Sequence, residues 1–401
     1  MRILMVSGTF PPRKFGGITA VTYILSRKLV QQGHHVSVYT TDVGDNRNTR
    51  LDVNKKEKLD GIDVHYFKNV NNKIAFDHRL YLPVGFASEI KKDIKNYDVV
   101  HIHDLRSYLC VVTCYFAQKY GVPYIIQPHG DIPYLFEGSP PIEKKKMVLK
   151  KIYDNSIGIR ILLNASVLVA LTEVEKEQFR RLVGSDATVK MIPNGIDLTE
   201  YSHLPPKGMF KREYHLKADD KIILFLGRIN KIKGVDFLIE SFSQLRKEIP
   251  NVKLVVTGPD DGYLEQAQEI ITKKNINEST IFTGPLYGEK KLEAYIDADI
   301  FVLPSRYETF PNTVLEASAC KTPVIMTNTC GISKLFDSQD CVVPFGDIHL
   351  LKEKIKKLLQ TEDLKIQYGN ENYIRIINEY NWDNVVKLIE NLYQSTIGGN
   401  E

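Results

Sequence analysis

The chain has 401 residues, of which 43% are hydrophobic and 25% charged, and its formal net charge is only +4. This length predicts two α/β domains rather than one, and so mild a charge argues against nucleic-acid binding. The apolar runs have the length of strands, not of membrane spans, and the N-terminal one reads as a buried strand rather than a signal peptide. Five cysteines without a CxxC pair are typical of reduced core thiols, so we expect a cytoplasmic protein.

Short apolar, β-branched runs alternate with segments of helical period, which is typical of parallel sheets covered by helices on both faces. In the first half the predicted strands are Arg2–Ser7, His35–Thr41, Ile62–Lys68, Val99–His103, Pro123–Pro128, Val167–Leu171 and Val189–Pro193. In the second half they are Lys221–Leu226, Lys253–Thr257, Thr280–Thr283, Ile300–Pro304, Pro323–Thr327 and Cys341–Pro344. We therefore predict an α/β protein of two doubly wound, Rossmann-like domains, residues 1–198 and 199–380, facing each other across a cleft. Ligands of such sheets bind at the carboxyl ends of the strands.

The loop after the first predicted strand ends in Gly16 and Gly17, where a helix is expected to begin. Glycines there let the backbone approach an anion, toward which the free amides of the helix start point. A flexible loop without a ligand is the alternative. The loop has no GxGxxG motif and the chain no acidic residue at the usual place for a ribose, which argues against dinucleotide binding.

Histidines lie in one predicted strand and directly after another. His129 comes directly after Pro123–Pro128 and can hydrogen-bond a sugar hydroxyl, although a purely structural histidine is the alternative. Strand alternation puts His101 and His103 on one face, but no carboxylate cluster stands nearby to complete a metal site. We expect no metal.

Arg228 and Lys233 lie between the first strand of the second half and the helix after it. A helix start disfavours positive charge, so the pattern favours a bound anion such as a diphosphate. Two solvated surface cations are the alternative.

Two carboxylates bracket the next helix start, because Glu308 follows the strand Ile300–Pro304 and Glu316 lies on the helix. Pro311 fits the first helical turn, which predicts free amide donors at Asn312, Thr313 and Val314. Glu316 suits a ribose diol, and Glu308 suits the hydroxyls of a transferred sugar.

Together these motifs resemble glycosyltransferase family 4, whose members have the GT-B fold. The resemblance extends over nearly the whole chain, from the glycine loop through His129 and Gly227-Arg228 to the spacing of glutamate, seven residues, glutamate at Glu308 and Glu316. Many members have glycine where Pro311 stands, and a proline removes one amide from the phosphate loop.

The resemblance implies a role for each motif. Arg228 and Lys233 would neutralise the donor diphosphate, Glu316 would bind the ribose and Glu308 the sugar, and His129 would contact the sugar near the reacting carbon. His129, Glu308, Arg228 and Lys233 are the implied catalytic residues. The implied donor site consists of Gly16, Gly17, Arg228, Lys233, Gly284, Pro285, Leu286, Glu308, Thr309, Phe310, Pro311, Asn312, Thr313 and Glu316.

The resemblance also implies a retaining, hexosyltransferase-type enzyme that needs no metal or other cofactor. Its donor would be a UDP- or GDP-sugar, and its acceptor a glycan, glycolipid or lipid-linked molecule used in cell-surface polysaccharide or glycoconjugate synthesis. A sugar-nucleotide epimerase or phosphorylase of the same fold, a non-catalytic nucleotide-binding relative and an NAD-dependent enzyme remain alternatives.

Two further segments have open interpretations. A C-terminal helix over 381–401 resembles the family's return crossing to the first domain, although Trp382 can equally be a core anchor. The basic amphipathic stretch with Lys144, Lys145, Lys146, Lys150 and Lys151 is expected either to associate peripherally with anionic membrane or to be a solvated helix face.

Overall fold

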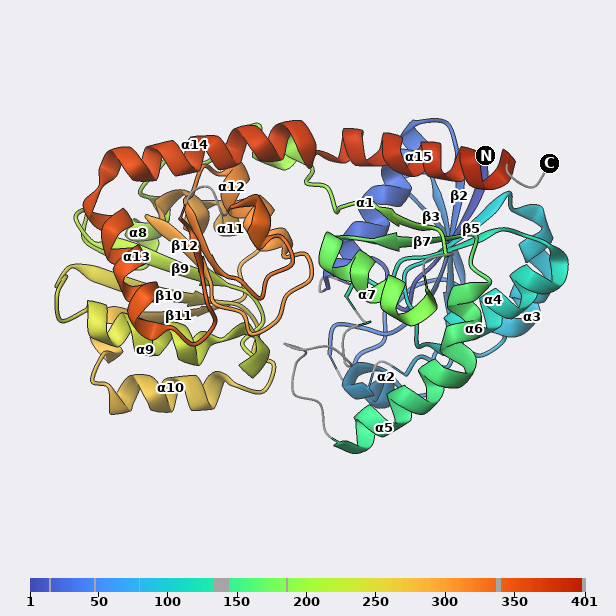
Figure 1. The fold of residues 1–401 in the computed structure, drawn as a ribbon, viewed down its shortest axis with the longest axis horizontal. Helices are drawn as coiled ribbons and strands as arrows, with labels where there is room; N and C mark the ends of the chain where they lie inside the picture. Colours follow the sequence, from blue (N-terminus) through green and yellow to red (C-terminus); the bar gives the residue numbers. More distant parts are fainter. Residues whose placement is uncertain are drawn as a thin grey trace. The chain divides into compact units, whose positions relative to one another are not determined.

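The computed structural model describes residues 1–13, 16–46, 48–78, 80–130, 132, 144–184, 187–336 and 340–398. The chain forms two compact units, one of residues 1–195 with 382–401 and one of residues 196–381. Each unit contains one sheet with helices on both faces (Figure 1).

The first sheet has eight strands in the order β3-β4-β2-β1-β5-β6-β7-β8. Their bounds are β1 Arg2–Val6, β2 His35–Thr41, β3 Lys56–Leu59, β4 Ile62–Phe67, β5 Val99–Ile102, β6 Tyr124–Ile126, β7 Val167–Ala170 and β8 Val189–Met191. The helices of this unit are α1 Gly17–Gln31, α2 Asn72–His78, α3 Phe86–Asp93, α4 Tyr108–Tyr120, α5 Lys144–Tyr153, α6 Ile159–Leu163, α7 Glu173–Val183 and α15 Trp382–Gly398.

Strand alternation divides the core of the first unit between the two faces of its sheet. Ile3 and Met5 of β1 point to one face and pack with α1 and α15. Leu4 and Val6 point to the other face and pack with α3, α4, α6 and α7. Because both faces are covered, the central strands β1, β5, β6 and β7 are buried along almost their whole length, as the sequence predicted.

The antiparallel strand β3 was not predicted. It pairs with β4 at the edge of an otherwise parallel sheet, and its sequence, Lys-Glu-Lys-Leu, contains no apolar run. Charged residues are common on edge strands because they discourage pairing with other chains. The signal that the prediction missed is the turn at Asp60 and Gly61, whose φ angles of 50° and 83° suit a two-residue hairpin.

The second sheet has six parallel strands in the order β11-β10-β9-β12-β13-β14. Their bounds are β9 Lys221–Leu226, β10 Val252–Thr257, β11 Thr280–Gly284, β12 Ile300–Leu303, β13 Val324–Thr327 and β14 Val342–Val343. The helices are α8 Met209–Glu213, α9 Val235–Leu245, α10 Leu264–Lys273, α11 Gly288–Asp297, α12 Asn312–Ala319, α13 Ile348–Gln360 and α14 Glu362–Glu379. The strand order reverses between β9 and β12, which is where such sheets bind their ligands.

The C-terminal helix α15 belongs to the first unit. Trp382, at its start, is 3% exposed and packs in the core beside α1. A Cβ atom at Gly195 would lie 2.8 Å from the Trp382 ring, so only glycine fits there. Trp382 is therefore a core anchor at the point where the chain re-enters this unit.

All five cysteines are free thiols and buried. Within the described ranges, no helix combines the length and the apolar character needed to cross a bilayer.

Candidate functional site

Two ion pairs lie at the carboxyl ends of β9, β10 and β12. Arg228 follows β9, and its Nη1 lies 2.6 Å from Oδ2 of Asp261, which follows β10. Lys233, in the single turn before α9, pairs with Glu308, which follows β12. Asn230 joins the pairs, since its Nδ2 donates to Asp261 over 2.8 Å and its Oδ1 accepts from the Lys233 amide over 3.1 Å. We call these five residues the strand-end network.

The loops that carry this network pack closely through their backbones. Gly258 directly follows β10 and has a φ angle of 145°, and a Cβ atom there would overlap the Gly227 carbonyl oxygen. Gly234 has φ 68°, and its Cβ atom would overlap the Pro304 carbonyl oxygen. Glycine at these two positions lets the loops after β9, β10 and β12 approach one another.

The backbone of Glu308 is also fixed. Its amide donates to Thr329 O over 3.4 Å, and its carbonyl accepts from the Gly331 amide over 2.7 Å. Lys233 and Glu308 each have 17% of the side chain exposed, so the pair is accessible to a ligand but largely shielded from water. In such surroundings a charge interaction is stronger than at an open surface.

Glu316 lies on α12 and is held by two residues of α11. Lys291 Nζ donates to Glu316 Oε1 over 3.0 Å, and the Tyr295 hydroxyl donates to Glu316 Oε2 over 2.9 Å. Burial lowers the pKa of Lys291, but the neighbouring Glu316 carboxylate outweighs it, so the net pKa of Lys291 is raised. Each carboxylate oxygen keeps a lone pair that can accept from a ligand hydroxyl.

The start of α12 differs from the prediction. Pro311 precedes the helix as its cap, with ψ 104°, and does not belong to its first turn. The Val314 amide donates to the Pro311 carbonyl over 3.0 Å, so the prediction that this amide is free was wrong. Asn312 and Thr313, both half-buried, are the first residues of the helix.

Thr309 and Phe310 face inward, each with 8% of its surface exposed. Thr309 Oγ1 lies 3.0 Å from the Tyr307 hydroxyl, and the Phe310 ring packs at 6.1 Å from the Tyr380 ring. If these two residues contact a sugar nucleotide, the contact must therefore come from their backbone.

The segment Gly284-Pro285-Leu286 lies at the end of the edge strand β11. Gly284 has φ 71°, and its carbonyl accepts from the Gly258 amide over 3.0 Å. Pro285 is exposed and Leu286 half-buried. The segment thus adjoins the loop that carries Asp261.

In the first unit, Gly16 caps α1, and Gly17 is its first residue. A Cβ atom at Gly17 would meet no atom of the described residues within 4 Å. Thr9 and Thr19 connect the two ends of the loop through their hydroxyl oxygens, 2.8 Å apart.

His129 follows β6 in the first unit and has a left-handed backbone, with φ 52°. Its Nε2 lies 2.9 Å from Nδ1 of His103, at the end of β5. His103 and His101 stack as strand alternation predicted, with ring centroids 4.2 Å apart. In the described part of the chain, no three His, Cys, Asp or Glu side chains are arranged to hold a metal ion.

The basic stretch forms α5, and the side chains of Lys144, Lys145 and Lys146 lie outside the described residues. Lys151 is exposed and Lys150 half-buried, while Val148 and Ile152 have 54% and 60% of their surface exposed.

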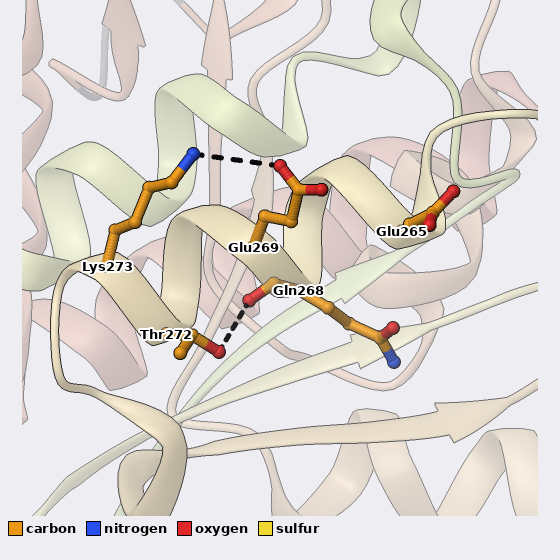
Figure 2. Close-up of a pocket in the computed structure, with 5 residues that line it drawn as sticks. All are labelled: Glu265, Gln268, Glu269, Thr272 and Lys273. Atoms are coloured by element: carbon orange, nitrogen blue, oxygen red, sulfur yellow. Dashed lines mark hydrogen bonds and ion pairs between the residues drawn. The ribbon is translucent and has the colours of Figure 1, made fainter.

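A shallow pocket runs along one face of α10 (Figure 2). It is lined only by residues of that helix, Glu265, Gln268, Glu269, Thr272 and Lys273. Lys273 pairs with Glu269 at 3.7 Å, and Thr272 Oγ1 donates to the Gln268 carbonyl over 3.0 Å (Figure 2). No predicted site residue lines it, so it has no part in the candidate site.

Sequence reasoning missed Asn230, Asp261, Lys291 and Tyr295. Asp261 had a usable signal, because Asp260-Asp261-Gly262 follows β10 as Arg228 follows β9. Lys291 and Tyr295 lie in a helix with an ordinary amphipathic pattern, and only the packing of α11 against α12 brings them to Glu316.

The two halves of the chain match two family models. The model described as Glycosyltransferase Family 4 matches residues 15–200, and that described as Glycosyl transferases group 1 matches residues 207–393.

Individual proteins match over almost their whole length. An uncharacterized glycosyltransferase of Methanocaldococcus jannaschii is 26% identical over 98% of each chain. The alpha-monoglucosyldiacylglycerol synthase of Streptococcus pneumoniae is 26% identical over 96% of this chain and 86% of its own. Among solved structures, HepE of Anabaena in complex with UDP-glucose has a TM-score of 0.77 and 16% identity, with 98% of this chain and 100% of that chain covered.

Proposed function

The chain belongs to glycosyltransferase family 4 and has the GT-B fold, and from this premise we propose which sugar transfer it carries out. It moves a sugar, with retention of anomeric configuration, from a UDP- or GDP-sugar to a glycan, glycolipid or lipid-linked acceptor. The product would be a cell-surface polysaccharide or glycoconjugate.

The strand-end network is the observation that carries the proposal. Arg228 and Lys233 lie at the switch point of the second sheet, joined through Asn230 and each next to a carboxylate. When the bond between sugar and phosphate breaks, negative charge grows on the diphosphate, and two positioned cations stabilise it. These cations can supply the charge that a metal supplies in other transferases, so we propose that the reaction needs no metal.

The remaining donor contacts follow from the geometry around this network. Glu316, held by Lys291 and Tyr295, would accept from the ribose hydroxyls, and Glu308 would accept from the transferred sugar. Backbone groups at the start of α12 and at Gly284, Pro285 and Leu286 would bind phosphate and base.

The first unit would bind the acceptor and contact the sugar. His129, with its unusual left-handed backbone, would donate to a sugar hydroxyl, and the backbone around Gly16 and Gly17 would meet the phosphate or the acceptor. A residue held in a sparsely populated backbone region is often part of a ligand site.

Two apolar surfaces favour a lipid-linked acceptor over a soluble glycan. On α5, Val148 and Ile152 are exposed beside Lys151. Beside the isolated antiparallel bridge between Asn69 and Pro83, Val70 and Val84 each have 62% of their surface exposed. A basic helix with exposed apolar side chains suits an anionic membrane surface, and the similar synthase from Streptococcus pneumoniae is named for a diacylglycerol product.

A donor screen followed by transfer assays tests the function. A sugar nucleotide that binds the folded protein raises its melting temperature. In a thermal-shift screen of UDP- and GDP-sugars, the true donor should therefore give a larger rise than the others. The selected donor should then glycosylate a lipid-linked acceptor with retention and in the presence of EDTA. Epimerised donor, phosphorolysis, or binding of nucleotide without any turnover would overturn the proposal.

Vesicle binding tests the membrane contact separately. Replacing Lys144, Lys145 and Lys146 with Gln should weaken binding to anionic vesicles, while removing the same charge at Lys247, Lys273 and Lys274 of the second unit should not. Equal binding by both triple variants would contradict the contact.

A further inference from the structure

Three histidines and a tyrosine form a continuous buried row in the first unit. The Tyr393 hydroxyl of α15 lies 2.8 Å from His101 Nδ1. The His101 and His103 rings stack, and His103 Nδ1 lies 2.9 Å from His129 Nε2. His101 and His103 are 0% and 1% exposed, and the row ends at His129, a half-buried residue.

Burial favours the neutral form of all three imidazoles. Burial lowers the pKa of His101 and of His129 to about 3, and it lowers the pKa of His103 well below the usual range. Two neutral rings share one proton in the bond between His103 and His129, so one ring must donate and the other accept.

The surroundings of His103 decide which ring donates. Its Nε2 is buried and has no hydrogen-bond partner among the described residues. If His129 donated, the proton of neutral His103 would lie on this Nε2 and form a buried, unpaired N–H group. If His103 donates, the Nε2 is only an unpaired acceptor. Buried N–H donors without partners are the rarer and costlier case, so donation by His103 is favoured.

The direction of this bond fixes the chemistry of His129. A neutral His129 that accepts at Nε2 must carry its own proton on Nδ1. Among the described residues, no hydrogen bond involves this Nδ1, so it is available to a ligand as a donor.

The backbone of His129 is held from the other side. Glu175 Oε1 accepts from the Gly130 amide over 2.8 Å, and its Oε2 accepts from the Leu171 amide over 2.7 Å. These bonds hold the strained turn at His129 and Gly130 against the end of β7. The ring and the backbone of His129 are thus positioned independently.

We propose that His103 is a positioning residue, which donates from Nδ1 to His129 and thereby presents His129 to the sugar as an Nδ1–H donor. The proposal rests on the proposed function, in which His129 contacts the transferred sugar. In that role His103 touches no substrate and acts only through His129.

Histidine NMR tests the proposal without any assay of turnover. In ¹⁵N-histidine protein free of ligand, His129 should be protonated at Nδ1 and unprotonated at Nε2. His103→Phe removes the donor but keeps a ring, and should give His129 a mixture of tautomers. His103→Asn restores a donor near the former Nδ1, and should restore the single tautomer. A His129 protonated at Nε2 in the unaltered protein, or an unchanged tautomer in His103→Phe, would overturn the proposal.

Kinetics supply the second arm. His103→Phe should lower kcat about tenfold, the effect of losing one neutral hydrogen bond, and leave UDP affinity unchanged, while His103→Asn should recover most of the rate. His101→Phe removes the bond to Tyr393 but not that to His129, so it is the control for general disturbance of the row. Equal loss in His101→Phe and His103→Phe would reduce His103 to a packing role. An unaltered protein that transfers no sugar, yet shows the expected tautomer, would overturn the proposed function and not the bond.

Discussion

Arg228 Nη1 lies 2.6 Å from Asp261 Oδ2, although 52% of the arginine side chain and 42% of the aspartate side chain are exposed. The cation expected to bind the diphosphate is thus paired with a carboxylate of the neighbouring loop. A diphosphate must share Arg228 with Asp261 or displace it.

Asp261→Asn should therefore tighten UDP binding. The substitution removes a competing negative charge but keeps an acceptor for Asn230, and an exposed ion pair contributes about 1 kcal/mol at most, so the gain should be up to about fivefold. Titration calorimetry with UDP measures it. Glu265→Gln, the same charge change on α10, should leave the affinity unaltered, and weaker binding in Asp261→Asn would show that Asp261 assists the ligand.

Lys233→Ala should lower turnover by about a hundredfold or more, because it removes a cation next to the leaving group and leaves Glu308 without its partner. Arg228→Ala should have a similar effect. Lys231→Ala is the control, since this exposed lysine lies in the same turn. Turnover close to that of the unaltered enzyme would remove Lys233 from the mechanism.

The sequence predicted the elements that bury apolar runs and missed the one that does not. Every predicted strand is present, because each contains a short apolar, β-branched run, whereas the charged edge strand β3 left only a turn signal at Asp60 and Gly61.

The site shows the same limit. Lys233 and Glu308, 75 positions apart, were predicted to share a site because both follow strands at one edge of a sheet, and the structure pairs them. Which charge faces which depends on side-chain packing, so Asp261 and Lys291 could not be assigned as partners from the sequence. One free amide too many was predicted at the start of α12, because the Val314 amide donates to the carbonyl of the capping residue, Pro311.

Lys291→Met should weaken UDP binding about tenfold. It leaves the Glu316 carboxylate, 19% exposed, with only the Tyr295 hydroxyl, so its charge is less stabilised and its orientation less fixed. Lys290→Met is a matched control, since the adjacent lysine is 51% exposed and pairs with Glu213 and Glu293 instead. Calorimetry with UDP and with inorganic diphosphate separates the effects, because the loss should appear only with the nucleoside. An equal loss with both ligands would place Glu316 at the phosphates.

Glu175 should make the stability of the first unit depend on pH. Burial raises the pKa of this carboxyl from 4.5 to about 7, although the Leu171 and Gly130 amides oppose the shift. Since the folded state binds this proton more tightly than the unfolded state, the contribution is fully present below about pH 4.5 and is lost as the pH rises toward 7. The free energy of unfolding should fall by about 3 kcal/mol at most across that window and stay level above it.

Urea unfolding of the unaltered protein and of Glu175→Gln, from pH 5 to 8, measures this dependence by difference, because all other groups cancel. Glu177→Gln, an exposed carboxyl on the same helix, should give a curve parallel to that of the unaltered protein. If the Glu175→Gln curve is parallel as well, the carboxyl is ionised throughout, and the two amides stabilise its charge more than burial opposes it.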